Sequence, residues 1–486
     1  MTTKIRTKRT LALLAVLALL ATGCRDAGGG GDEALEDTQA DLTEEPADTG
    51  APTEADTAIQ TPDATDEEPA GATEEETDGQ QAAAGDVEFD VGVTDQACPE
   101  AANPDNGCIY LGTISDLTVG PFAALANPIT DAQAAFWSRV NADGGIGGFD
   151  VDVSEHVRDN EYNPERHNQE YQAIKGDVLA LAQTLGSPTT AAIIDDMETD
   201  QIVGAPASWT SLWAFEDVVV ESGINYCLEA MNQVDYAVEN VDGGVGSVIA
   251  VGYPGDYGGD AAAGVAVAAE ANGIEFTNIE TGQGPDNQAG AISGIVQQQP
   301  DLVIVTTGPA DAGAIVGQTA AQGYAGQFMF TGPSWNKGLL DSPAAPAVES
   351  LVLLSGPWPP YDADTPGHEA MREALGDVDP NEGYTSGWAW SYPLRAALEQ
   401  AASNGDLTRA GLLEAIGQIE SVDYEGMLPE GAGNLAGDPN EAVVRQSVIF
   451  RPDPEAATGA TLVEDFFTGP TAESYELEGP CFTTTG

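Results

Sequence analysis

The sequence predicts an α/β protein with two Rossmann-like lobes, each built on a parallel sheet. Short, almost continuously apolar stretches alternate with stretches of helical spacing, and this alternation occurs in two separate series. Near-continuous apolar strands are typical of parallel sheets that helices cover on both faces. About 400 residues follow the low-complexity N-terminal part, which is enough for two domains of ordinary size.

The first series begins at residue 109 with an apolar run that suits a buried strand. The helix that follows has Pro128 near its start and places Ile129, Phe136 and Val140 on one face. The expected elements of this series are strands over 109–114, 151–157, 178–183 and 201–205, and helices over 128–142, 164–174 and 187–197.

The second series begins at residue 245. Its expected elements are strands over 245–251, 276–279, 302–306 and 328–331, and helices over 260–272, 288–299 and 310–323. In open α/β sheets, ligands bind beyond the carboxyl ends of the strands. We therefore expect the functional residues on the loops that follow strands, where two lobes can face each other across a cleft.

The N-terminus has the pattern of an export signal. Four basic residues between positions 4 and 9 precede an apolar run over 11–20, which is too short to cross a bilayer as a helix of roughly 20 residues. Small residues at 21–23 lead directly to Cys24, and this resembles a bacterial lipobox with Ala21 where leucine is usual. We predict a lipoprotein signal peptide over 1–23 and lipidation of Cys24. The alternative is an ordinary secretory signal with an incidental cysteine. No other apolar stretch approaches spanning length.

Residues 24–95 are predicted to form an acidic, disordered tether. The stretch 25–80 contains 19 acidic residues and one basic residue, Arg25. Such a composition cannot bury enough apolar surface to offset the entropy of ordering, and like charges extend the chain. The tether would hold the fold away from the membrane.

The charge balance excludes whole classes of partner. Of 15 basic and 80 acidic side chains, 10 basic and 61 acidic ones remain after the signal and the stretch 25–80 are set aside. A nucleic-acid partner is excluded, because phosphate binding requires clustered Lys and Arg. An acid-rich surface with few lysines suits a salty habitat, where repulsion is screened over a few ångströms.

Four cysteines follow Cys24, at Cys98, Cys108, Cys227 and Cys481. An even number in an exported chain predicts two disulfides, with three possible connectivities. Cys98 and Cys108 flank a turn-rich segment and are favoured as a local pair, which leaves Cys227 with Cys481.

The sequence offers no sign of catalysis. The three histidines lack metal-ligand spacing, and no HExxH, GxSxG, P-loop or CxxC motif occurs. The glycine-rich segment 144–148 follows a helix and precedes a strand, so we interpret it as a turn and not as a phosphate loop. We expect neither an enzyme nor a cofactor or metal site.

An ordered set of motifs resembles the branched-chain amino acid (Leu/Ile/Val-binding) family of type I periplasmic substrate-binding proteins of ABC transporters. The resemblance covers about residues 109–482. The motifs are Gly112–Ser115 with Gly120-Pro121-Phe122, Val140–Gly148, Asp159 with Asn163-Pro164 and Tyr171, Gly186-Ser187 with Thr190, Asp256-Tyr257-Gly258, Gln318–Gly323, Gly332-Pro333, Gly383–Leu398 and Leu407–Arg409.

The resemblance implies a three-strand hinge between the lobes, with crossovers near residues 222, 355 and 435. Lobe 1 would comprise 105–222 and 356–435, and lobe 2 would comprise 223–355 and 436–486. It also implies closure on a small solute and delivery to ABC permease subunits. Combined with the lipobox, it predicts a monomer that a lipid anchor holds on the outer face of the cytoplasmic membrane.

The same resemblance implies the ligand site. In the family, the lobe-one loops hold a ligand carboxylate through hydroxyls and backbone N–H groups. The implied positions are Ser115, Leu117, Phe122, Ser187, Thr189, Ala207, Ser208 and Trp209 in lobe one, and Tyr257, Gly308, Ser334 and Trp335 in lobe two. Helix N-capping is the alternative for Ser187 and Thr189, because caps prefer the same residues. Packing in the core is the alternative for Trp209 and Tyr257.

One departure from the family affects the ligand. Ser334 stands where amino-acid-binding members carry the Glu that pairs with the ligand ammonium, and burying an unpaired ammonium is costly. A carboxylate, an amide or an aromatic acid suits the site better, unless Asp311 or Asp116 substitutes. We expect a receptor of an ABC importer for a branched-chain amino acid or a related small polar or carboxylate solute. The alternatives are a sensor of the same fold without transport and an extracellular hydrolase.

Overall fold

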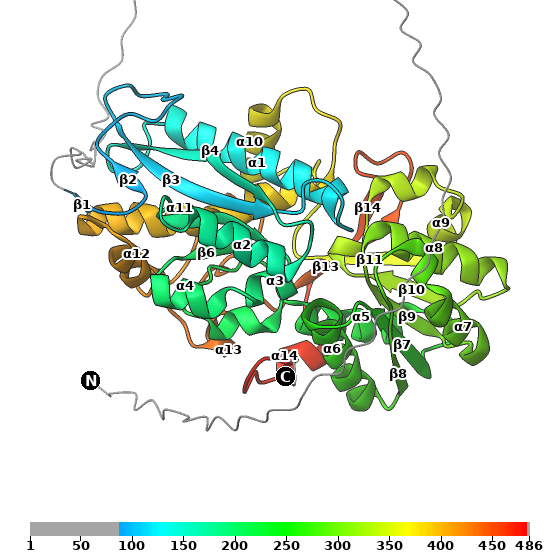
Figure 1. Cartoon of the computed structure of the whole chain (residues 1–486). Helices are drawn as coiled ribbons and strands as arrows, with labels where there is room; N and C mark the ends of the chain where they lie inside the picture. The colour runs from blue at the N-terminus through cyan, green and yellow to red at the C-terminus, as the bar shows by residue number, and fades with distance from the viewer. Residues whose placement is uncertain (1–86, 484–486) are drawn as a thin grey trace, which may run out of the picture. The chain divides into compact units, whose positions relative to one another are not determined.

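The computed structural model describes residues 87–483, and these residues form two α/β lobes (Figure 1). The predicted signal peptide, Cys24 and the predicted tether up to residue 86 lie outside the described residues. Within the described range, no helix combines the length and the apolar character needed to cross a membrane.

Lobe one is built on a five-stranded sheet. Its strands are β2 (Val93–Thr94), β3 (Gly107–Ser115), β4 (Phe149–Asp159), β5 (Ala180–Leu185) and β6 (Gly204–Ala207). The helices packed with them are α1 (Ala123–Ala142), α2 (Pro164–Ile174), α3 (Ser187–Ala191), α4 (Ile194–Asp200), α10 (Pro366–Leu375), α11 (Glu382–Asn404) and α12 (Arg409–Ile416). Strands β3 to β6 run parallel, while β2 pairs antiparallel with β3.

Lobe two is built on a seven-stranded sheet in the order β14-β13-β11-β10-β9-β7-β8. The strands are β7 (Ser247–Gly252), β8 (Glu275–Glu280), β9 (Leu302–Thr306), β10 (Gln327–Phe330), β11 (Val352–Gly356), β13 (Ser447–Pro452) and β14 (Ala460–Phe467). The helices are α5 (Tyr226–Asn240), α6 (Asp256–Asn272), α7 (Ala289–Gln298), α8 (Pro309–Ala321), α9 (Ala345–Leu351) and α14 (Pro470–Ser474). Strand β13 pairs antiparallel with both β11 and β14. Because β2 is also antiparallel to β3, each sheet is mostly parallel but includes antiparallel strands, which the prediction of parallel sheets did not include.

The chain passes between the two sheets three times, after β6, after β11 and before β13. The first and third connections lie side by side, because Ile224 and Val444 form a parallel bridge. The third connection includes the short helix α13 (Pro439–Ala442).

The long helices α1 and α11 pack against each other and form the centre of lobe one. Phe136 on α1 is fully buried and meets the rings of Trp388 and Tyr392 on α11 edge-on, at centroid distances of 5.1 and 5.0 Å. Edge-to-face packing is favourable for aromatic rings. This contact fixes α11, whose first turn reaches the cleft between the lobes.

The predicted tether is too long at its C-terminal end. Strand β1 (Glu88–Phe89) pairs with β12 (Asp406–Leu407), and β2 pairs with β3, so residues 88–94 belong to the fold. Val87 and Val93 are buried, and Phe89 packs edge-on against Phe149 at 5.5 Å. These apolar residues give the segment enough buried surface to belong to the fold.

The largest differences from the predicted helix bounds concern α1 and the predicted helix over 187–197. Helix α1 begins at Ala123, so Pro128 lies inside the helix and not near its start. The predicted helix over 187–197 is two short helices, α3 and α4. The glycine-rich segment 144–148 forms the predicted turn, in which four glycines have positive φ and Ile146 bridges to Phe149.

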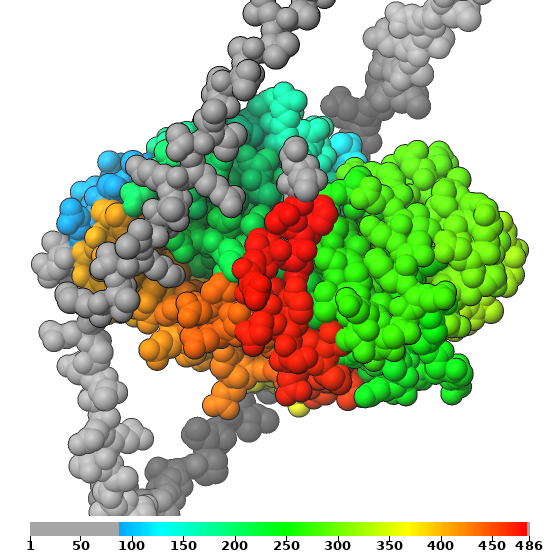
Figure 2. Space-filling view, turned by 90° about the horizontal axis from the view of Figure 1, so that it is seen from below, coloured from blue at the N-terminus to red at the C-terminus, as the bar shows by residue number. Residues whose placement is uncertain are grey.

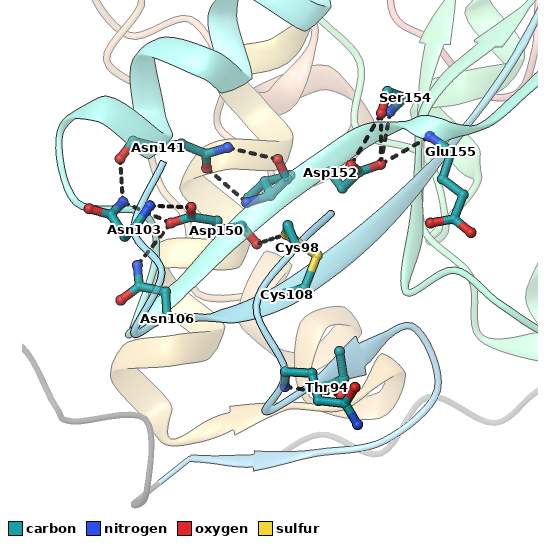
Figure 3. The surroundings of a disulfide bond; sticks show 12 residues. Thr94, Cys98, Asn103, Asn106, Cys108, Asn141, Asp150, Asp152, Ser154 and Glu155 are labelled. Carbon is teal, nitrogen blue, oxygen red and sulfur yellow. Dashed lines mark hydrogen bonds between the residues drawn. A yellow bond between two sulfur atoms is a disulfide. The ribbon is translucent and has the colours of Figure 1, made fainter. Parts of the chain in front are cut away.

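The structure contains the disulfides Cys98–Cys108 and Cys227–Cys481. Beside the first one, the buried carboxylate of Asp150 accepts hydrogen bonds from the side-chain amides of Asn103 and Asn106 at 2.8 and 2.9 Å (Figure 3). These bonds tie the disulfide loop to the start of β4.

The second disulfide ties the C-terminal segment to α5 of lobe two. The backbone N–H of Cys481 also donates to the hydroxyl of Ser211 in lobe one, at 2.8 Å. Figure 2 shows this segment, in red, between the orange and green parts of the surface. It therefore contacts both lobes close to their connections.

Candidate functional site

A pocket with an empty volume of ≈ 920 Å³, part of it open to solvent, lies between the two lobes. Its lobe-one wall comes from loops that follow strands, with Phe122 after β3, Tyr162 after β4, Ser187 after β5 and Trp209 after β6. Lobe two contributes Tyr257 after β7, and also the segments after β10 and β11. The pocket thus lies beyond the carboxyl ends of the strands, where open α/β sheets bind ligands.

Aromatic rings form a continuous wall along this pocket. Phe122 lies 4.8 Å from Tyr162 and 5.9 Å from Tyr257 between ring centroids, and Tyr257 lies 4.7 Å from Tyr226. Tyr226 in turn lies 5.9 Å from Trp209. Such a wall favours a ligand with an apolar or aromatic body.

The wall continues from Trp209 into two further tryptophans. Trp390 lies 4.6 Å and Trp358 lies 5.4 Å from the ring of Trp209. The indole N–H of Trp209 donates to the carbonyl of Ser222 at 2.8 Å, which fixes the ring. Trp209 therefore lines the pocket and packs in the core at the same time.

Ser187 presents a hydroxyl without a protein partner. Its Oγ is buried and neither accepts nor donates a hydrogen bond within the protein. The N-cap position of α3 belongs to Gly186, whose φ of 97° suits glycine, and Ser187 is the first helical residue. N-capping therefore does not explain Ser187. A buried polar atom without a partner is costly, so this hydroxyl is available to a ligand.

Trp390 carries the second unpartnered polar atom of the pocket lining. Its Nε1 is buried and has no hydrogen-bond partner, although the residue is only 2% exposed. An indole N–H can only donate. A donor of this kind suits a carboxylate or carbonyl oxygen.

The charges at the pocket exclude a conventional ion pair with the ligand. Among the described residues that line it, none is Lys, Arg or His, and Glu382 is the one acid. Burial raises the pKa of Glu382 to about 7, although hydrogen bonds from Thr458 and from the backbone of Tyr361 lower it. A carboxyl group that is already bonded and partly protonated is a poor partner for an ammonium.

A second buried acid lies behind the pocket wall. Glu229 on α5 accepts a hydrogen bond from the hydroxyl of Ser355 at 2.5 Å, and Ser355 lines the pocket. Burial raises the pKa of Glu229 to about 7, against lowering hydrogen bonds from Ser355 and Gly332. The residue supports the wall and does not line the pocket.

Seven of the twelve implied ligand residues line this pocket. They are Phe122, Ser187, Ala207, Ser208, Trp209, Tyr257 and Trp335. The other five are Ser115, Leu117, Thr189, Gly308 and Ser334, and they lie outside the lining.

Hydrogen bonds within each lobe explain most of these five positions. Ser115 is buried and accepts from the side chain of Gln183 at 2.8 Å, and the hydroxyl of Thr189 donates to the carbonyl of Gly186 at 2.8 Å. The hydroxyl of Ser334 donates to Thr307 O and accepts from Thr307 N, at 2.8 and 3.1 Å. The N–H of Gly308 donates to the Tyr253 hydroxyl at 2.9 Å.

The two acids considered as substitutes for the missing glutamate are also engaged elsewhere. Asp116 accepts from the N–H groups of Gly120 and Phe122, both at 2.9 Å. Asp311 accepts from the Tyr253 hydroxyl at 2.6 Å. Neither residue lines the pocket, so neither replaces the ammonium partner.

The lining residues missed in the sequence include Tyr162, Tyr226, Trp358, Glu382 and Trp390. Trp358 follows β11, a strand that had no predicted counterpart, and Tyr226 begins α5, a helix that the alternation of elements also missed. For Tyr162, the available signal was its position shortly after the predicted strand over 151–157.

One group of potential metal ligands occurs among the described residues, at Cys227, Asp260 and Cys481. The two sulfurs are joined in a disulfide, so they offer no thiolates to an ion.

Comparison with known protein families gives one match, in which residues 109–457 fit the model of the periplasmic binding proteins. A comparison with curated protein sequences finds no match.

Solved structures with a similar fold include three informative ones. A fatty acid ABC transporter substrate-binding protein from Thermomonospora curvata has 27% identity and a TM-score of 0.73, covering 81% of this chain and 98% of its own. A branched-chain amino acid ABC transporter protein from Thermus thermophilus with bound valine has 15% identity and a TM-score of 0.66, covering 76% and 98%. A leucine-binding protein from Thermotoga maritima has 16% identity and a TM-score of 0.61, covering 74% and 98%. At such identities the last two show the fold alone.

Proposed function

Because the chain belongs to the periplasmic binding protein family, whose members bind small solutes for the permease subunits of ABC transporters and are not enzymes, we propose that it binds a carboxylate with an apolar body. The observation that carries this proposal is the pocket itself. Its wall is aromatic, its free polar atoms are neutral, and its single acid is already bonded.

The head of the ligand would be held by neutral donors. The hydroxyl of Ser187 and the indole N–H of Trp390 have no protein partner, and both can donate to a carboxylate. Hydrogen bonds to a charged group contribute roughly 1.5–3 kcal/mol each. Donors of this kind stabilise the charge without a buried counter-ion.

The body of the ligand would lie along the aromatic wall. Burial of apolar surface contributes about 25 cal/mol per Å². The similarity to a protein described as a fatty acid receptor supports this choice over an α-amino acid. An ammonium would meet no free anion in this pocket, and the cost of burying it unpaired is several kcal/mol.

Contacts across the cleft link binding to closure. Phe122 of lobe one and Tyr257 of lobe two lie 5.9 Å apart at the pocket. A solute that contacts both residues stabilises the closed arrangement over the open one, because only a ligand with different affinities for two states shifts their equilibrium.

Mass spectrometry of the small molecules released from the purified protein tests the proposal. We expect an apolar monocarboxylate in a stoichiometric amount. Release of a zwitterionic amino acid, or of a polyol, would contradict it.

The lipid anchor belongs to the same proposal. Cys24 would carry the lipid, and the acidic segment up to residue 86 would connect it to the fold on the outer face of the membrane, as a monomer beside its permease. The Cys24→Ser variant should then leave the membrane fraction after a salt wash. Retention of that variant on the membrane would refute the anchor.

A further inference from the structure

The ligand pocket adjoins a second, smaller hollow with an empty volume of ≈ 170 Å³. The two share three lining residues, Leu125, Trp335 and Glu382. Thr458 and Lys337 line only the smaller hollow. These three shared residues therefore form the boundary between the two spaces, and Thr458 lies behind Glu382 on the side of the smaller hollow.

The contact at this boundary joins the two lobes. Glu382 is the first residue of α11 in lobe one, and Thr458 lies between β13 and β14 in lobe two. The hydroxyl of Thr458 donates to Oε1 of Glu382, and Thr458 is only 2% exposed. The indole N–H of Trp335 donates to the carbonyl of Thr458 at 3.2 Å. Segments of both lobes thus fix this end of the pocket.

A second link between the lobes lies close by. Nζ of Lys337 in lobe two lies 2.5 Å from Oδ1 of Asp379, just before α11 in lobe one. The Asp379 side chain is 85% exposed, so this ion pair stabilises closure only weakly. The Glu382–Thr458 contact, which is partly buried, is the stronger of the two contacts.

A ligand body that reached beyond the boundary would have to separate Thr458 from Glu382. Separation would remove one of the hydrogen bonds of a partly buried carboxyl group, which is unfavourable. It would also remove a contact that holds the lobes together. A ligand that is too long therefore binds less favourably for two reasons: it breaks a hydrogen bond at the end wall, and it weakens the closed arrangement of the lobes.

We infer that Glu382, held in place by Thr458, forms the end wall of the pocket and sets the greatest length of the carboxylate that the protein binds. This inference rests on the proposed function, because it presumes a ligand with an apolar body. It assigns chain-length selection to two residues that face each other from different lobes.

Isothermal titration calorimetry with a homologous series of straight-chain monocarboxylates tests the inference. For the wild type, we expect affinity to rise about fourfold with each added methylene, until the body reaches the wall, and to fall beyond that length. The Thr458→Ala variant removes the hydroxyl that holds Glu382 and widens the smaller hollow behind it. Its optimum should shift to longer acids, with a gain of about tenfold or more for acids longer than the wild-type limit, while short acids bind as before.

Two further variants distinguish an effect on the end wall from an effect on closure of the lobes. Glu382→Ala opens the same boundary from the other lobe and should shift the optimum in the same direction. Asp379→Asn removes only the exposed ion pair, at a residue that lines neither space, so it should change all affinities by a similar factor and leave the optimum in place.

The outcomes are distinguishable. If no acid of the series binds the wild type, the proposed function fails and this inference fails with it. If acids bind and the optimum stays at the same length in both Thr458→Ala and Glu382→Ala, the inference alone is overturned. A shifted optimum in Asp379→Asn would likewise contradict it, because length would then depend on closure and not on the wall.

Discussion

Replacing Ser187 with alanine should weaken binding without destabilising the empty protein. Ser187 is only 1% exposed, and its hydroxyl has no protein partner. Removal of the hydroxyl therefore breaks no hydrogen bond. Relief of an unpartnered buried polar atom should leave the free energy of unfolding unchanged or raise it by about 1 kcal/mol. Loss of one donor to a carboxylate should weaken binding by roughly 1.5–3 kcal/mol, which is on the order of 10- to 100-fold.

Calorimetric titration with the bound carboxylate and urea unfolding of the empty protein measure the two effects. Thr189→Val is the matched control, because the Thr189 hydroxyl lies in the same helix and donates to the carbonyl of Gly186 at 2.8 Å. This control should lose about 1 kcal/mol of stability with little direct effect on affinity. The reasoning fails if Ser187→Ala destabilises the empty protein as much as the control does, or if it binds the ligand as tightly as the wild type.

Three further predictions concern the whole fold. The double variant Cys227→Ser with Cys481→Ser opens a loop with a sequence separation of 254, and urea unfolding should show a loss of about 4–5 kcal/mol; an unchanged midpoint would contradict the bracing role of this disulfide. Burial raises the pKa of Asp256 to about 6 and the pKa values of Asp260 and Glu229 to about 7, above their values in the unfolded chain. Because such carboxyl groups have pKa values of about 4 in the unfolded chain, their stabilisation is complete below about pH 4 and is lost progressively as the pH rises to about 7. The free energy of unfolding should therefore be several kcal/mol greater near pH 5 than near pH 8; equal values would refute this. The excess of acidic side chains predicts a melting temperature that rises in about 1 M salt, where the screening length is near 3 Å, whereas a melting temperature independent of salt would show that repulsion is unimportant.

Local patterns were sufficient for much of the fold. The period of the apolar residues identified helix α2 and strand β9 within a residue or two, because each is a regular element with one or two fully buried faces. Strands β13 and β14 were missed, since their antiparallel pairing at a sheet edge depends on contacts with β11 that lie far away in the sequence. Residues 88–94 were assigned to the tether because the apolar residues that anchor them are few and stand next to acidic ones.

Site residues were predictable where their role depends on their position in a loop after a strand. They were not predictable where their role depends on hydrogen-bond partners or packing contacts in the folded protein. Ser187 and Tyr257 follow strands and line the pocket. Ser334 also lies after a strand, but its hydroxyl bonds to the backbone of Thr307, which only the folded arrangement reveals. The contribution of α11 was missed because Trp390 and Glu382 reach the pocket through the packing of α11 in lobe one, a contact between distant parts of the chain.

The central claim is that the pocket accepts a carboxylate with an apolar body and rejects an ammonium. The most direct measurement is calorimetric titration with a matched pair of ligands, phenylalanine and 3-phenylpropanoate, which share a skeleton and differ in the amino group. We predict that the acid without the amino group binds at least about 100-fold more tightly, because the ammonium would be buried without a free anionic partner. Tighter binding of phenylalanine would contradict the account and would show that the pocket supplies an anion after all.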